Sequence, residues 1–158
     1  MQVQGSRQTL FVLSISLFLG LTLWFSSNVV ASQLLSAFNA SALCQTFLSI
    51  AVTGGFVIGC LVYASLNIAD VIDAKTVFVL SVFLGGVSNS LAAIAWSFEI
   101  VILFRAVTGF FLAGVYPVGM KLAASWFLKD RGYALGVMVG ALTLGSGLPY
   151  LIRLMNFP

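Results

Sequence analysis

The sequence predicts an all-α integral membrane protein that crosses the bilayer five times. Apolar residues make up 61% of its 158 positions, and Asp, Glu, Lys and Arg together make up 7%. A soluble domain carries about 25% charged residues, because its surface has to face water. In addition, the apolar residues form long continuous runs separated by short segments that hold most of the charges. These three observations indicate that most of the surface faces lipid.

Each run is long enough for a transmembrane helix, which needs about 20 predominantly apolar residues. Strands of a membrane barrel would alternate polar and apolar positions over about ten residues, whereas these runs are continuously apolar. We therefore expect one helical bundle over residues 1–158, with spans at residues 9–30, 43–66, 76–96, 100–127 and 133–152.

The first three runs have the features of ordinary membrane helices. The first continues through Trp24 without a small-residue cleavage site directly behind it, which favours an uncleaved span over a signal peptide. The second carries Gly55 and Gly59 at a spacing of four, and small residues at that spacing let two helices pack closely. The third ends at Trp96, where an aromatic belt would meet the membrane surface.

The last two runs contain residues that weaken or bend helices. The fourth is about 42 Å long at helical rise, which predicts a tilted or bent helix. Pro117 lies inside it and removes a backbone donor, so we expect a bend and a candidate gating position there. The fifth carries Gly136, Gly140 and Gly145, which we expect to pack against other helices.

The positive charges predict the orientation of the bundle. Arg7 precedes the first run, Lys75 separates the second from the third, and Lys129 and Arg131 separate the fourth from the fifth. Cytoplasmic loops carry such an excess, so we expect a cytoplasmic N-terminus. Because these cations are dispersed, they give no support to nucleic-acid binding.

The sequence contains no pattern typical of an enzyme or a cofactor site. It has no histidine, and Cys44 and Cys60 lie about 24 Å apart on one predicted helix. This spacing matches neither a metal site nor a disulfide between them. No nucleophile lies beside a base, and no phosphate loop follows a strand. We expect no metal and no cofactor.

Arg105 is the one charge that lies well inside an apolar run. A cation at mid-helix costs roughly 2.5–3.5 kcal/mol on insertion scales, so such residues are usually functional. The sequence leaves two roles open. The side chain could extend to the headgroups at the outer end of its helix. Alternatively, it could offer a charged donor fork to an anionic substrate or bias a proton-carrying group.

Two further groups of polar residues are candidates for function. Trp24 and Asn28 lie in a polar and aromatic patch that could contact substrate or form part of an interfacial belt. At the cytoplasmic side, Asp70 could pair with Arg131 or Lys129 and help to close that side of the bundle.

Three segments resemble signatures of one transporter family. Asp70 and Lys75 occupy acidic and basic positions of a loop signature, Gly-x-Leu-Ala-Asp-Arg-x-Gly-Arg-Lys. Arg105 and Gly109 match Arg-x-x-Gln-Gly, with Thr108 in place of glutamine. The glycine-rich fifth run falls where antiporters carry Gly-x-x-x-Gly-Pro-x-x-Gly-Gly. In order and spacing, the chain resembles the N-terminal half of a major facilitator superfamily transporter, loosely like bacterial nitrate/nitrite and cyanate permeases.

The resemblance implies a multi-pass protein of a bacterial inner membrane that moves a small solute by alternating access. Arg105 makes an anion the expected substrate. The substrate-binding or coupling residues that we expect are Arg105, Thr108, Gly109, Trp24 and Asn28. The gating residues that we expect are Asp70, Lys75, Arg131 and Pro117.

Superfamily members consist of two six-helix halves with the substrate site between them. This chain provides five predicted spans, so we expect a truncated six-helix half that is inactive alone. Its partners would be the lipid bilayer, a small-molecule substrate, and a missing C-terminal half or another subunit. The alternative is a non-transporting membrane subunit that packs against partner proteins.

Overall fold

The structure, a computed structural model, describes residues 2–29, 34, 36, 38 and 42–155. Within these residues it is helical, with no strand, which confirms the predicted all-α membrane fold. Five helices of the described part of the chain are long and apolar enough to cross a membrane. The helices are α1 (Gln2–Val29), α3 (Ala42–Ser65), α4 (Ile68–Val71), α5 (Ala74–Ala93), α6 (Phe98–Trp126) and α7 (Arg131–Leu154).

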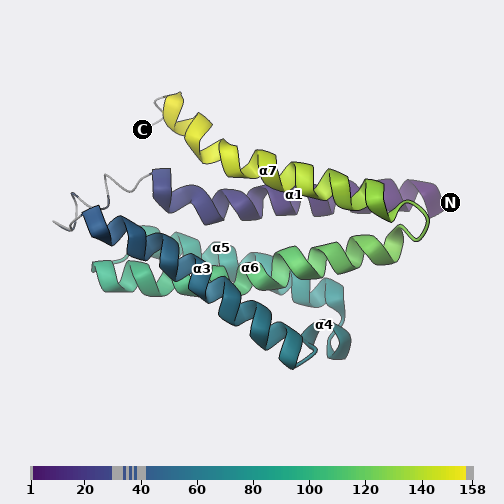
Figure 1. Ribbon diagram of the computed structural model, residues 1–158, viewed down its shortest axis with the longest axis horizontal. Helices are drawn as coiled ribbons and strands as arrows, with labels where there is room; N and C mark the ends of the chain where they lie inside the picture. The colour runs from purple at the N-terminus through teal and green to yellow at the C-terminus, as the bar shows by residue number, and fades with distance from the viewer. Residues whose placement is uncertain (1, 30–33, 35, 37, 39–41, 156–158) are drawn as a thin grey trace.

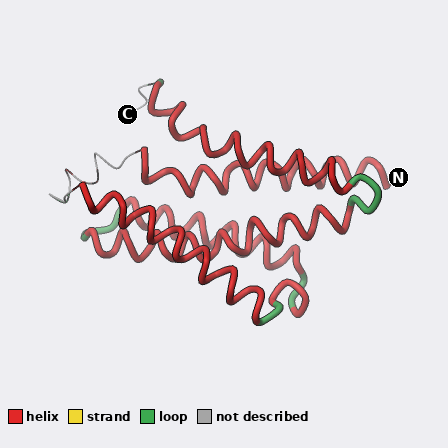
Figure 2. The backbone as a smooth tube through the Cα atoms, in the orientation of Figure 1, coloured by secondary structure: helices red, strands yellow, loops and turns green. Residues whose placement is uncertain are grey.

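The helices form two groups that α6 and α1 join. α7 lies along α1, and α3 and α5 both pack against α6, which is the most heavily contacted helix of the bundle (Figure 1). α1 also packs against α6, and this contact connects the two groups. Figure 2 shows the N-terminus and the α6–α7 loop at one end of the bundle, and the α5–α6 loop at the other.

Short polar segments begin and end the helices. Asp73 precedes α5 and accepts hydrogen bonds from the backbone N–H and the hydroxyl of Thr76, at 2.9 and 3.0 Å. These hydrogen bonds to its charged form lower the pKa of Asp73. α4, a single helical turn, is not among the elements predicted from the sequence. It follows Asn67, whose backbone has the left-handed conformation with φ 47°.

The main core lies between α1, α5, α6 and α7. Its largest buried side chains include Leu17, Phe78, Val115 and Met138. Many other large apolar side chains point outward, for example Leu144, which is 71% exposed. In lipid, such exposure carries no hydrophobic cost, so close packing and hydrogen bonds must hold the helices together.

Glycines bring α3 and α6 into backbone contact. A Cβ on Gly55 would overlap the carbonyl oxygen of Ala106, and a Cβ on Gly59 would lie 2.6 Å from the carbonyl oxygen of Phe110. From the other side of the same contact, a Cβ on Gly109 of α6 would overlap the carbonyl oxygen of Val52 in α3. Because these neighbours are main-chain atoms, a larger side chain could enter only if the helices moved apart.

The glycines of α7 differ in their surroundings. Gly145 faces α1, where a Cβ would overlap the carbonyl oxygen of Phe18. Gly136 and Gly140 have no atom within 4 Å of such a Cβ, so the packing role expected for them is not found within the described chain. The buried face of α7 carries Ala134 and Met138, and a step of two residues turns about 200° around a helix. Gly136 and Gly140 therefore point away from α1.

We predict that Gly109→Ala will destabilise the purified protein by about 1–3 kcal/mol, because the added methyl group forces two backbones apart. Gly136→Ala is the matched control, since its methyl group enters open space and Ala favours the helix. Thermal unfolding in detergent measures both. Equal stability of the two variants would contradict the described α3–α6 contact.

Candidate functional site

Arg105 is buried where three helices meet. Its side chain is 1% exposed, although it lies near the start of a transmembrane helix. Nη1 donates to the carbonyl oxygen of Leu23 at 2.9 Å and to Oδ1 of Asn89 at 2.8 Å, and Nη2 donates to the carbonyl oxygen of Trp24. The guanidinium thus connects α6 to α1 and α5. The alternative that Arg105 extends to the headgroups is wrong for this structure, because the side chain is buried and both Nη atoms donate inside the bundle.

Asn89 is a member of this site that the sequence analysis missed. It is half-buried in α5, and its Oδ1 accepts from Ser26 Oγ of α1 at 3.3 Å as well as from Arg105. A signal was present, because an amide side chain inside a predicted membrane span is costly unless it has a partner. The sequence around Asn89 did not, however, indicate that Arg105 is that partner.

Neutral oxygen atoms accept every hydrogen bond that Arg105 makes within the described chain. Its Nε has no hydrogen-bond partner there, although the atom is buried. The ion pair found among the described residues joins Lys121 to Asp70, and no carboxylate reaches Arg105. Hydrogen bonds to a charged group contribute about 1.5–3 kcal/mol each, which helps to offset the cost of burial. No carboxylate among the residues that the structure describes neutralises the positive charge itself.

A cavity of about 480 Å³ lies between α1, α3, α6 and α7; it shares Trp24 with this site, and Arg105 is not among its lining residues. Its walls are mainly apolar and aromatic, with Trp24 and Tyr116 among them, and Thr143 and Ser146 add hydroxyl groups. Both hydroxyls donate to carbonyl oxygens of their own helix, at 2.9 and 2.7 Å. Their lone pairs can still accept a hydrogen bond from a ligand.

Trp24 belongs both to the cavity and to the Arg105 site. Its ring lines the cavity and meets the ring of Phe56 edge to face, with centroids 5.2 Å apart. Its carbonyl oxygen accepts a hydrogen bond from Arg105. Asn28, the other candidate on α1, has a side chain outside the described residues.

Thr108 and Gly109 are buried and do not line this cavity, so their expected role in substrate binding stays a prediction. Thr108 is 0% exposed, and its hydroxyl donates to the carbonyl oxygen of Phe104 at 2.8 Å, within its own helix. Gly109 faces the backbone of α3. Of these two positions, Gly109 therefore shapes the α3–α6 contact.

Asp70 makes an ion pair with Lys121, which is not the partner expected from the sequence. Lys121 Nζ lies 2.6 Å from Asp70 Oδ1 and donates to the carbonyl oxygen of Ala69 at 2.8 Å. The pair ties the segment after α3 to the far part of α6. Both side chains are largely exposed, so the pair contributes no more than about 1 kcal/mol.

The other expected gating residues show no such contact among the described residues. Lys75 and Arg131 are exposed and form no ion pair there. α6 continues as one helix through Pro117, which is exposed on its surface.

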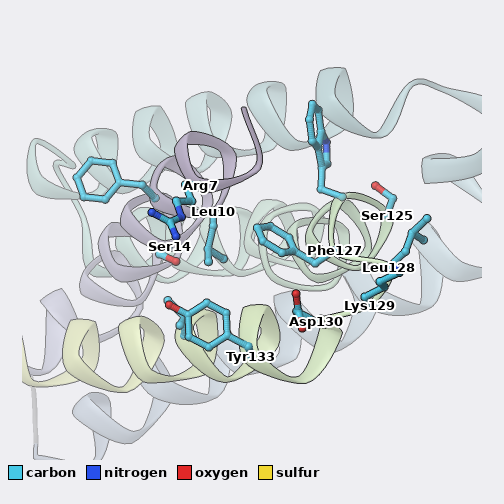
Figure 3. Close-up of a pocket in the computed structure, with 12 residues that line it drawn as sticks. Arg7, Leu10, Ser14, Ser125, Phe127, Leu128, Lys129, Asp130 and Tyr133 are labelled. Carbon is cyan, nitrogen blue, oxygen red and sulfur yellow. The ribbon is translucent and has the colours of Figure 1, made fainter. Parts of the chain in front are cut away.

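A second cavity, of about 1040 Å³, lies at the end of the bundle that holds the N-terminus. Figure 3 shows its labelled lining residues, which come from α1, the end of α6, the following loop and α7. Unlike the cavity beside Trp24, it carries charges: Arg7, Lys129 and Asp130.

Comparison with known proteins places the chain in a family. Residues 12–152 match the family model described as Major Facilitator Superfamily. No curated protein and no solved structure matched the chain. The family match covers most of the chain and includes the parts of the five described membrane-spanning helices that lie between residues 12 and 152. This chain therefore belongs to the Major Facilitator Superfamily, whose members transport small solutes across membranes.

Proposed function

We propose that this chain forms the N-terminal helices of a transporter that carries a small anion by alternating access. The observation that supports an anion is the buried charge of Arg105, which no carboxylate of the described chain neutralises. In a low-dielectric interior, an unneutralised cation attracts an anion much more strongly than it would in water. A residue of this kind inside a membrane protein usually marks a substrate or ion pathway.

The cavity beside Trp24 is the proposed place of binding. Its volume of about 480 Å³ lies within the usual range for ligand pockets, about 300–1,000 Å³. In the described conformation, Arg105 is covered and donates to the carbonyl oxygens of Leu23 and Trp24. A movement of α1 away from α6 would release these donors. The anion would then replace the two carbonyl oxygens, so that binding and helix movement become coupled.

We further propose that these helices work against others, supplied by a C-terminal half or another subunit in a bacterial inner membrane. Between 17% and 44% of each membrane span is buried within this chain, so broad faces are free to contact further helices. A major facilitator transporter binds its substrate between two halves. A non-transporting subunit would use the same faces, but it would need Arg105 only for the hydrogen bonds that link α6 to α1 and α5.

Replacing Arg105 tests the proposed role of its charge. With the chain and its partner helices in proteoliposomes, Arg105→Gln should lower the kcat/KM of anion uptake by roughly tenfold to a hundredfold, the effect of losing charged hydrogen bonds. Arg105→Lys should retain part of the activity, because it keeps the charge but not the planar fork. The assay uses small inorganic anions and carboxylates, with neutral amides of similar size for comparison. Unchanged anion uptake at normal expression would contradict the proposal.

Replacing Asn89 separates binding from stability. Asn89→Asp places a carboxylate where Arg105 already donates at 2.8 Å, so the bundle should unfold at the same or a higher temperature. Because the new carboxylate neutralises the cation, the KM for the anion should rise about tenfold. Asn89→Ala, the comparison variant, should lower the unfolding temperature, because it removes an acceptor and leaves the charge. If Asn89→Asp transported anions as well as the native protein, the charge of Arg105 would not be needed for binding.

A further inference from the structure

The cavity at the N-terminal end of the bundle is separate from the site at Arg105 and Trp24. Arg7 and Ser14 of α1 lie on one side of it in Figure 3, and Lys129 of the α6–α7 loop lies on the other. We propose that this cavity binds a phosphate group, which in a membrane is most readily supplied by the headgroup of a phospholipid. This proposal does not depend on the proposed transport of an anion.

The depth of the cavity in the membrane favours a headgroup. Arg7 marks the start of the membrane span of α1, Trp126 is the last residue of α6, and Tyr133 lies in the first turn of α7. All three line the cavity. Trp and Tyr gather where the hydrocarbon meets the headgroups. Basic pockets between transmembrane helices at this level bind the headgroups of phospholipids.

Ser14 provides a second and independent indication of a ligand. Its side chain is 8% exposed, and its Oγ has no hydrogen-bond partner among the described residues. A hydroxyl in a helix usually donates to the carbonyl oxygen four residues earlier, as Thr22 does to Phe18 at 3.0 Å. A buried hydroxyl without a partner is unfavourable. A phosphate oxygen in the cavity would accept its hydrogen bond.

The charges around the cavity suit a phosphodiester. Arg7 and Lys129 are cations, whereas Asp130 is an anion, so the three sum to one positive charge. The carboxylate of Asp130 makes no capping hydrogen bond to α7 and is therefore available to the cavity. A phosphodiester carries a single negative charge, which this set balances. Inorganic phosphate carries more than one charge at neutral pH, and Asp130 would repel the excess.

The test is the binding of palmitoyl-oleoyl phosphatidylglycerol to the whole purified chain in detergent, measured as lipid adducts by native mass spectrometry. The expected loss of affinity is about fivefold for Arg7→Gln and again for Lys129→Gln, the effect of one surface cation on an anionic lipid. Lys75→Gln is the matched control, because Lys75 is an exposed cation outside the cavity. The double variant Arg7→Gln/Lys129→Gln combines both changes. The proposal would be overturned if this variant bound the lipid as tightly as the native protein does. It would also be overturned if Lys75→Gln lowered the lipid affinity as much as Arg7→Gln or Lys129→Gln does.

Ser14→Ala tests the buried hydroxyl. Removing an unpartnered hydroxyl should keep or raise the unfolding temperature without lipid, whereas it should lower the affinity for the lipid about fivefold. Native lipid affinity in Ser14→Ala would count against this cavity as the site.

A comparison with inorganic phosphate shows whether the cavity binds a lipid headgroup or free phosphate. Inorganic phosphate should raise the unfolding temperature much less than the lipid does, and Asp130→Asn should increase its effect. If inorganic phosphate alone protects the native protein, and Arg7→Gln/Lys129→Gln abolishes the protection, the site binds free phosphate. If neither the lipid nor inorganic phosphate binds the native protein more strongly than it binds the double variant, the cavity is not a phosphate site.

Discussion

The burial of one guanidinium constrains how this bundle is assembled. Arg105 can be buried away from water only if nearby oxygen atoms accept its hydrogen bonds. These oxygen atoms belong to Leu23 and Trp24 of α1 and to Asn89 of α5. Because Arg105 belongs to α6, the same side chain joins the α1–α7 pair to the group of α3, α5 and α6. Helices in lipid gain little from hydrophobic burial, so a charged group with several acceptors is an effective link.

Close backbone contacts supply the rest of the cohesion, and they place α6 at the centre. Gly109 lies one turn beyond Arg105 and faces α3, whereas Arg105 reaches α1 and α5. The two neighbouring positions therefore serve different contacts of one helix. At α7 a single glycine, Gly145, makes the close approach to α1, and most of that helix stays exposed. The helices differ accordingly: α6 is held on several sides, whereas α7 rests mainly on α1.

The two cavities combine these features in different ways. The one beside Trp24 has mainly apolar walls, and Arg105 is linked to it through the carbonyl oxygen of Trp24 without lining it. The one near Ser14 is lined by the side chains of Arg7, Lys129 and Asp130, whose charges are already exposed. We propose different ligands for the two: a transported anion that binds as α1 moves at the first, and a lipid headgroup that needs no such movement at the second.

Much of the fold could be predicted from the sequence, because membrane helices follow from composition and length alone. The five spans, their helical nature and the unusual position of Arg105 were determined in this way. Only the tertiary structure decided which residues meet. Arg105 lies 82 residues from Leu23, and Asp70 lies 51 residues from Lys121, so neither pair is visible in a local pattern. Likewise, Gly136 resembled a packing residue, yet the rotation of α7 about its axis points it away from α1. Rotation and neighbours are set by contacts across the whole bundle, and for that reason the spacing of residues along one helix could not predict them.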